Sequence, residues 1–115
     1  MGHLDLAREA DVVVVAPASA DYIAKTAHGL AGDVLGAVLL ATEAPVIMVP
    51  AMNTNMWKHA ATQSNVKLLG QRGVGWVGPA EGRLACGVEG PGRMAPVVEI
   101  VEAIDKVVRK KVKIK

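Results

Sequence analysis

Two short apolar runs, each stopped by a proline, dominate the hydrophobic pattern of the chain. Val12–Ala16 ends before Pro17, and Val46–Val49 ends before Pro50. Continuous β-branched runs without polar alternation are typical of strands buried on both faces. A shorter run over Val74–Val77 predicts a third strand.

Helical patterns separate these runs. The predicted helices are one that ends near Ala10, one that reaches Gly29 from a cap at Ser19 or Asp21, one over Val34–Ala41 capped by Asp33, and one over Lys58–Leu69. Each predicted strand therefore alternates with helical segments.

The end of the chain predicts a last amphipathic helix that opens at Ala95 and Pro96. Its apolar residues are expected to face the sheet: Val98, Ile100, Val101, Ile104 and Val108. Two connections complete the pattern. Ala51–Trp57 is predicted to be a connection of mixed polarity, and Gly78–Gly92 a long ordered loop, because glycine and proline are frequent in it.

Strands that alternate with helices predict an α/β fold, namely a three-layer, doubly wound parallel sheet of the flavodoxin or Rossmann type. The pattern opens on a helix, without the strand and Gly-rich turn that begin such folds, so we expect an N-terminally truncated version. One domain is predicted over residues 1–108, which carry a net charge of −3. Residues 109–115 carry five positive charges and no negative ones, as a basic tail or the start of a linker would.

Composition narrows the classes of protein. Cys86 is the only cysteine, which excludes an internal disulfide framework and favours the cytoplasm. We expect no membrane association, because the apolar runs are far too short to span a bilayer and no signal peptide is visible. No aromatic or Gly-rich motif accompanies the basic tail, so we expect no nucleic-acid partner.

Ligands of open parallel sheets bind beyond the carboxyl ends of the strands. Three polar segments follow the predicted strands: Pro17–Asp21, Pro50–Trp57 and Gly78–Met94. Their convergence predicts a pocket.

Four motifs in these regions resemble the flavin-containing cysteine decarboxylases. Pro50–Trp57 (PAMNTNMW) matches their PxMNxxMW signature, and Leu84–Gly87 (LACG) with Gly90–Met94 (GPGRM) matches their substrate clamp. Gly2–Leu6 (GHLDL) resembles the segment with their active-site histidine, and Ala16–Asp21 (APASAD) their flavin-contacting loop. The motifs occur in the family's order and are most similar to the phosphopantothenoylcysteine decarboxylases, as found in the bacterial bifunctional proteins of coenzyme A synthesis.

This resemblance implies decarboxylation of 4'-phosphopantothenoylcysteine to 4'-phosphopantetheine with FMN as cofactor. FMN would oxidise the substrate's thiol to a thioaldehyde, which allows carbon dioxide to leave and gives a stabilised enethiolate. Reduced FMN would then return the electrons, and a proton would be added. The family's active site lies between subunits, so a homo-oligomer, a trimer or dodecamer, is implied.

The resemblance also assigns roles to three residues. His3 would be the base near thiol and flavin, although a histidine alone at this place would be read as a surface residue. Asn53 would hydrogen-bond the substrate carboxylate; the alternative is a turn residue after Pro50. Cys86 would donate a proton when the enethiol is reduced; the alternative is an inert buried thiol.

The remaining predicted site residues form two sets, and no metal ligands are expected. The cofactor set is Pro17, Ala18, Ser19, Asp21 and Met52, and the substrate set adds Met56, Trp57, Ala85, Gly87, Arg93 and Met94 to Asn53.

Two other functions stay open. The first is a non-catalytic or regulatory paralogue that keeps the substrate clamp without a full flavin site. The second is a peptidyl-cysteine decarboxylase of peptide-antibiotic maturation, which the present motifs resemble less.

Overall fold

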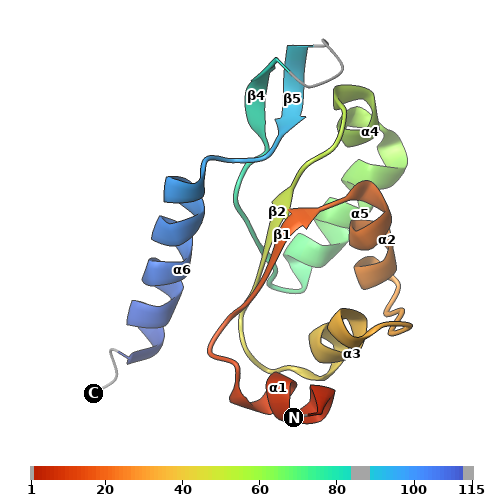
Figure 1. Ribbon diagram of the computed structural model, residues 1–115. Coiled ribbons are helices and arrows are strands. Elements are labelled where there is room, and N and C mark those ends of the chain that lie inside the picture. The colour runs from red at the N-terminus through yellow and green to blue at the C-terminus, as the bar shows by residue number, and fades with distance from the viewer. Residues whose placement is uncertain (1, 84–88, 113–115) are drawn as a thin grey trace.

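A parallel sheet with helices on both faces forms the centre of the molecule (Figure 1). The computed structural model describes residues 2–83 and 89–112. The sheet has the order β1-β2-β3. Its strands are β1 (Val13–Ala18), β2 (Val46–Pro50) and β3 (Gly75–Trp76). Val14 lies opposite Ile47 and Val15 opposite Met48, and both neighbouring pairs of strands are parallel.

Six helices surround this sheet in the part of the chain that the structure describes. They are α1 (His3–Glu9), α2 (Ala20–Ala27), α3 (Val34–Ala41), α4 (Thr54–Lys58), α5 (Ala60–Gln71) and α6 (Val97–Val112). A two-stranded antiparallel sheet pairs β4 (Ala80–Arg83) with β5 (Glu89–Arg93).

The core is divided between the two faces of the sheet. On one face, Val15 and Met48 pack with Ile23 of α2 and Leu69 of α5. On the other face, Ile47 and Val49 pack against α6. This arrangement confirms the predicted three-layer α/β fold, in which the strands are buried because helices cover both sides.

Two predictions on the strands and connections are wrong. Pro17 does not stop β1, which continues to Ala18 after a shift of register against β2. A proline is tolerated there because β1 is an edge of the described sheet and the ladder is irregular at that point. Ala51–Trp57 is not only a connection either, since α4 begins within it, at Thr54.

The Gly/Pro-rich segment is the largest difference from prediction. Instead of a long loop, it contains the paired strands β4 and β5. Gly82, Gly90 and Gly92 have φ values of 148°, 138° and 136°, which side-chain-bearing residues rarely adopt. The glycines therefore belong to extended pairing strands, although their composition is typical of loops.

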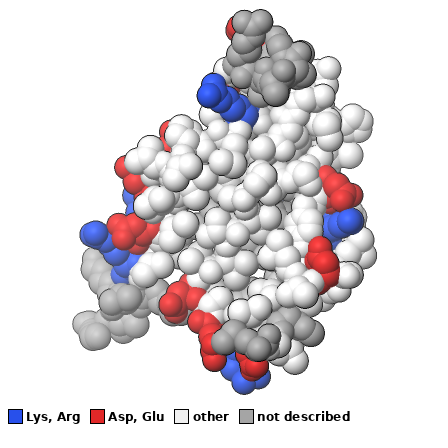
Figure 2. Space-filling view, viewed as in Figure 1, with Lys and Arg blue, Asp and Glu red and all other residues white. Residues whose placement is uncertain are grey.

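The last helix differs from prediction in the face that it buries. Ile100 is buried, and Ile104 and Val107 pack with it against the sheet. Val98 and Val101, which were predicted to face the sheet, are 63% and 56% exposed. In the view of Figure 2, charged side chains gather at the margins and the middle of the face is uncharged. The last helix, α6, also continues past Arg109 to Val112, into the segment predicted as a basic tail or the start of a linker.

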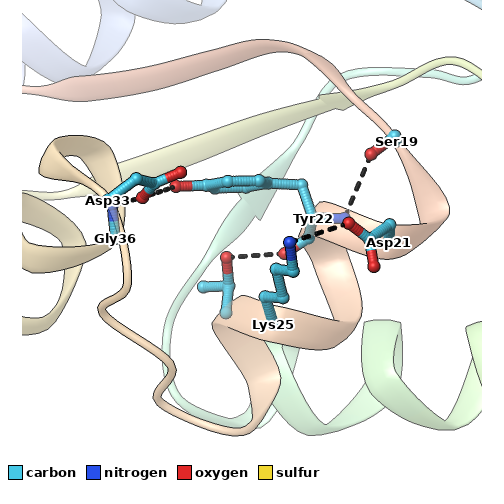
Figure 3. A network of polar contacts seen from close by, with 7 residues as sticks. Ser19, Asp21, Tyr22, Lys25, Asp33 and Gly36 are labelled. Carbon is cyan, nitrogen blue, oxygen red and sulfur yellow. Dashed lines mark hydrogen bonds and ion pairs between the residues drawn. The ribbon is translucent and has the colours of Figure 1, made fainter.

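A small polar network joins α2 to α3 (Figure 3). The Ser19 hydroxyl oxygen caps α2 by accepting from Tyr22 N at 3.0 Å, which decides the cap in favour of Ser19. Asp33 Oδ1 accepts from Gly36 N at 2.7 Å, as predicted, and from the Tyr22 hydroxyl at 3.0 Å. The network thus holds α2, which begins next to the predicted flavin-contacting loop, against the start of α3.

We expect the pKa of Tyr22 to lie well above that of free tyrosine. Burial raises it, and the hydrogen bond to Asp33 and the charge of that carboxylate raise it further, from 10.0 to about 12. The folded state then favours the neutral phenol. Its contribution to stability is complete below pH 10 and is lost as the pH rises towards 12.

Tyr22 is the only tyrosine, so the ultraviolet absorbance of tyrosinate measures this pKa directly. The Asp33→Asn variant should titrate closer to pH 10 than the wild type. An equal midpoint in both proteins would contradict the role of the Asp33 charge. The pKa of Asp33 is lowered, first by the hydrogen bond that it accepts from Gly36 N and then by the hydrogen bond from the Tyr22 hydroxyl.

Gly36 leaves no room for a side chain at the start of α3. A Cβ there would lie 2.8 Å from Leu30 O and 3.1 Å from Ala31 Cα. We expect Gly36→Ala to lower the free energy of unfolding by about 1 to 2 kcal/mol, despite alanine's better helix propensity. Gly32→Ala is the matched control, since nothing lies within 4 Å of its Cβ. Urea unfolding would test this, and equal stability of both variants would contradict it.

Candidate functional site

The candidate site lies beyond the carboxyl ends of β1 and β2. Ala18 lies opposite Pro50, the last residue of β2. Just beyond this pair, Ala51 N donates to Ala18 O at 3.1 Å. The two predicted ligand-binding segments therefore leave the sheet side by side.

The end of β1 and the start of α2 offer one polar group that has a hydrogen without an acceptor among the described residues. Pro17 is exposed, whereas Ala18 is fully buried and its methyl group belongs to the core. The Ser19 oxygen accepts from Tyr22 N, so its own hydrogen remains available to donate. Asp21 instead pairs with Lys25 along α2 at 3.1 Å, and its side chain is 74% exposed.

Asn53 has its amide held in one orientation. Its Oδ1 accepts from Met56 N at 2.8 Å and so caps α4, while Trp57 N donates to its backbone carbonyl at 3.0 Å. No described residue accepts a hydrogen bond from Nδ2, and the side chain is exposed. The cap therefore turns the donor half of the amide towards solvent, where it can meet a ligand.

The other predicted residues of this segment surround the Asn53 turn. Met52 is half-buried and packs against the core cluster that α2 and α5 cover. Met56 is 47% exposed and Trp57 half-buried. They can supply apolar wall without a charged group.

The β4–β5 hairpin lies directly over this turn. Met52 N donates to Gly92 O at 2.8 Å. A Cβ at Gly90 would lie 2.9 Å from Cγ2 of Thr54, and a Cβ at Gly92 would overlap the Met52 carbonyl oxygen. The glycines thus allow the hairpin backbone to touch the turn that carries Asn53.

Two further predicted substrate residues are Arg93, the last residue of β5, and Met94, which follows it. Arg93 is exposed, and its guanidinium lies 3.2 Å from the position of a Cβ on Gly82. Met94 packs with Ile47 and Val49 on the face covered by α6. Of these two predicted residues, Arg93 therefore has the side chain that is exposed and can reach a ligand.

The remaining predictions cannot be placed in the same way. Ala85, Cys86 and Gly87 lie outside the described residues, as does the side chain of His3. The helix that begins at His3 packs against α3, at the end of the sheet where the strands begin (Figure 1). One chain thus does not bring α1 and the Asn53 turn together.

Two hollows lie at that same amino end of the sheet. One, of about 800 Å³, is lined by residues of α1, the α3–β2 connection and α6, including Arg8, Glu43 and Lys110. The other, of about 580 Å³, lies between α3 and α5. Both hollows lie at the end of the sheet opposite to Asn53. The volume of a hollow therefore does not identify the site that the motifs predict.

Two further features come from the described residues alone. No three His, Cys, Asp or Glu side chains among them come together as a metal ion would need. Within the described ranges, none of the helices combines the length and hydrophobicity that a bilayer crossing needs.

Sequence reasoning missed Thr54, Gly90 and Gly92. Thr54 is 4% exposed, and its hydroxyl has no hydrogen-bond partner in the described part of the chain. The alternation of Gly90 and Gly92 is a signal that could have indicated a strand whose glycine face touches another backbone.

Comparison with known proteins agrees with the fold and the motifs. The family model described as Flavoprotein matches residues 1–109. The coenzyme A biosynthesis bifunctional protein CoaBC of Vibrio vulnificus strain YJ016 is 48% identical over 101 residues, 88% of this chain and 25% of that protein. CoaBC of Escherichia coli K12 is 49% identical over 102 residues, 89% of this chain and 25% of the relative.

Solved structures give the same result. A PPC decarboxylase mutant complexed with pantothenoylaminoethenethiol has a TM-score of 0.87 and 36% identity, over 90% of this chain and 58% of that one. The FMN binding protein AtHal3 has a TM-score of 0.85 and 35% identity, and the match covers 94% of this chain and 60% of that one. The chain spans about a quarter of the curated relatives and under two thirds of these structures. The matching motifs, fold and family model together establish that this chain belongs to the Flavoprotein family.

Proposed function

We propose that the chain contributes to FMN-dependent decarboxylation of 4'-phosphopantothenoylcysteine to 4'-phosphopantetheine. The main support is the Asn53 amide, whose Oδ1 is occupied by the α4 cap while its Nδ2 has no acceptor among the described residues. Support also comes from the similarity to a PPC decarboxylase, with a TM-score of 0.87.

The role of Asn53 follows from the chemistry of the bond that breaks. A carboxylate must be held in place, yet a cation beside it would stabilise the charge that has to be lost. A neutral amide donor orients the carboxylate with less stabilisation of the ground state. The apolar surface of Met56 and Trp57 beside it would keep water from the reacting group.

FMN is the cofactor that we propose, and it would supply the oxidation of the thiol and the later return of electrons. The exposed Pro17 and the free Ser19 hydrogen fit a flavin because they offer an apolar surface and a donor at the carboxyl end of β1. His3 and Cys86 remain the proposed proton-transfer residues, on the strength of the motifs alone.

The proposed assembly is a homo-oligomer, a trimer or dodecamer, that shares its sites between copies. Within one chain, α1 and the Asn53 turn lie at opposite ends of the sheet (Figure 1). We therefore assign the His3 of one copy and the Asn53 of another to a common site. The cytoplasmic location stays a prediction from the single cysteine.

The first test is FMN binding. Ser19→Ala and Ser19→Asp both remove the hydroxyl donor, but aspartate keeps an acceptor for the α2 cap. We expect both variants to raise the Kd for FMN by about three- to tenfold, as the loss of one hydrogen bond would. Fluorescence quenching of titrated FMN measures this. If wild-type protein leaves FMN fluorescence unchanged at saturation, the chain alone is not an FMN enzyme and the non-catalytic alternative is favoured.

The second test concerns Asn53. In Asn53→Asp the Oδ1 cap is retained, but an anionic oxygen replaces the Nδ2 donor and repels the substrate carboxylate. We expect kcat/KM of FMN-loaded protein to fall about a hundredfold or more, the usual loss for one preorganised donor. Asn55→Asp is the matched control because Asn55 is an exposed residue of the same helix. If the Asn53→Asp variant released carbon dioxide as fast as the wild type, the role assigned to Asn53 would be wrong.

A further inference from the structure

One face of β5 is made of glycine and lies on the turn that carries Asn53. Gly90 and Gly92 are two residues apart, so they point to the same side of the strand. A Cβ at Gly90 would lie 2.9 Å from Cγ2 and 3.2 Å from Oγ1 of Thr54. At Gly92 it would overlap the Met52 carbonyl oxygen and lie 3.3 Å from the carbonyl carbon of Asn53.

Hydrogen bonding and burial reinforce this contact. Met52 N donates to Gly92 O at 2.8 Å, immediately before Asn53. Gly92 is buried, and Thr54, immediately after Asn53, is 96% buried (4% exposed) beneath the hairpin. The residues on both sides of Asn53 are therefore held by the same strand, while Asn53 itself stays exposed.

We propose that Gly90 and Thr54 are positioning residues for the Asn53 amide. Their close contact sets the distance between β5 and the start of α4, and so fixes the backbone from which Asn53 caps Met56. This inference rests on the proposed function, because it gives the amide its role at the substrate. It adds that the hairpin determines where the Nδ2 donor lies.

The chain offers a matched set of variants. Gly90→Ala puts a methyl group against Thr54. Gly82→Ala introduces the same kind of backbone strain, with a φ of 148° against 138°, but meets only the flexible end of Arg93. Thr54→Ala in the Gly90→Ala background removes both close atoms and leaves the Thr54 Cβ at an ordinary 3.6 Å. It breaks no hydrogen bond to a described residue, since none of them pairs with the Thr54 hydroxyl.

Amide hydrogen exchange of Met52 and Met56, followed by NMR on the 115-residue chain, tests the contact without any cofactor. We expect Gly90→Ala to speed both exchanges about tenfold relative to Gly82→Ala, in the range that an overpacked contact costs. The double variant should return to within about threefold of Gly82→Ala. Equal effects of Gly90→Ala and Gly82→Ala, or no recovery in the double variant, would overturn the proposal.

Activity of the FMN-loaded protein is the second readout. We expect Gly90→Ala to lower kcat about tenfold relative to Gly82→Ala, with equal affinity for FMN, and the double variant to recover. A merely structural contact would change exchange and leave kcat equal in the two single variants, which would also overturn the positioning role. If the wild type shows no decarboxylation, the proposed function fails, whereas amide exchange still decides whether the hairpin holds the turn.

Discussion

Burial of the central strand β2 between two helical layers is the constraint on which the structure depends. Met48 and Val49 are fully buried, and they belong to opposite core clusters. Because neighbouring side chains of a strand point to opposite faces, β2 needs a helix on each side. The layers of α2 and α5 on one face and α6 on the other meet this requirement.

The same burial fixes where the candidate site lies. Pro50 ends β2 inside the core, so the chain must leave the sheet and place Asn53 just beyond its edge. There Asn53 begins α4 and keeps its amide donor exposed. A rigid strand therefore positions a short turn, and the turn positions the chemical group.

Contact with a second small sheet completes this arrangement. The hairpin approaches the Asn53 turn through the glycines Gly90 and Gly92 of β5, and Gly92 O accepts a hydrogen bond from Met52 N. A strand with side chains on that face could not approach so closely. Glycine composition that indicates a loop in the sequence thus serves close packing of two backbones in the fold.

The sequence by itself determined the parallel α/β fold, because the runs at Val12–Ala16 and Val46–Val49 are apolar on both faces, and it determined the cap at Asp33, whereas the choice of Ser19 over Asp21 as the other cap came from the structure. These signals are local and depend on side-chain type. Only the tertiary structure decided that Gly78–Gly92 contains paired strands, that Val98 and Val101 of α6 are exposed, and that α1 lies away from Asn53. Strand pairing and the burial of a helix face depend on partners distant in sequence, which no local pattern specifies.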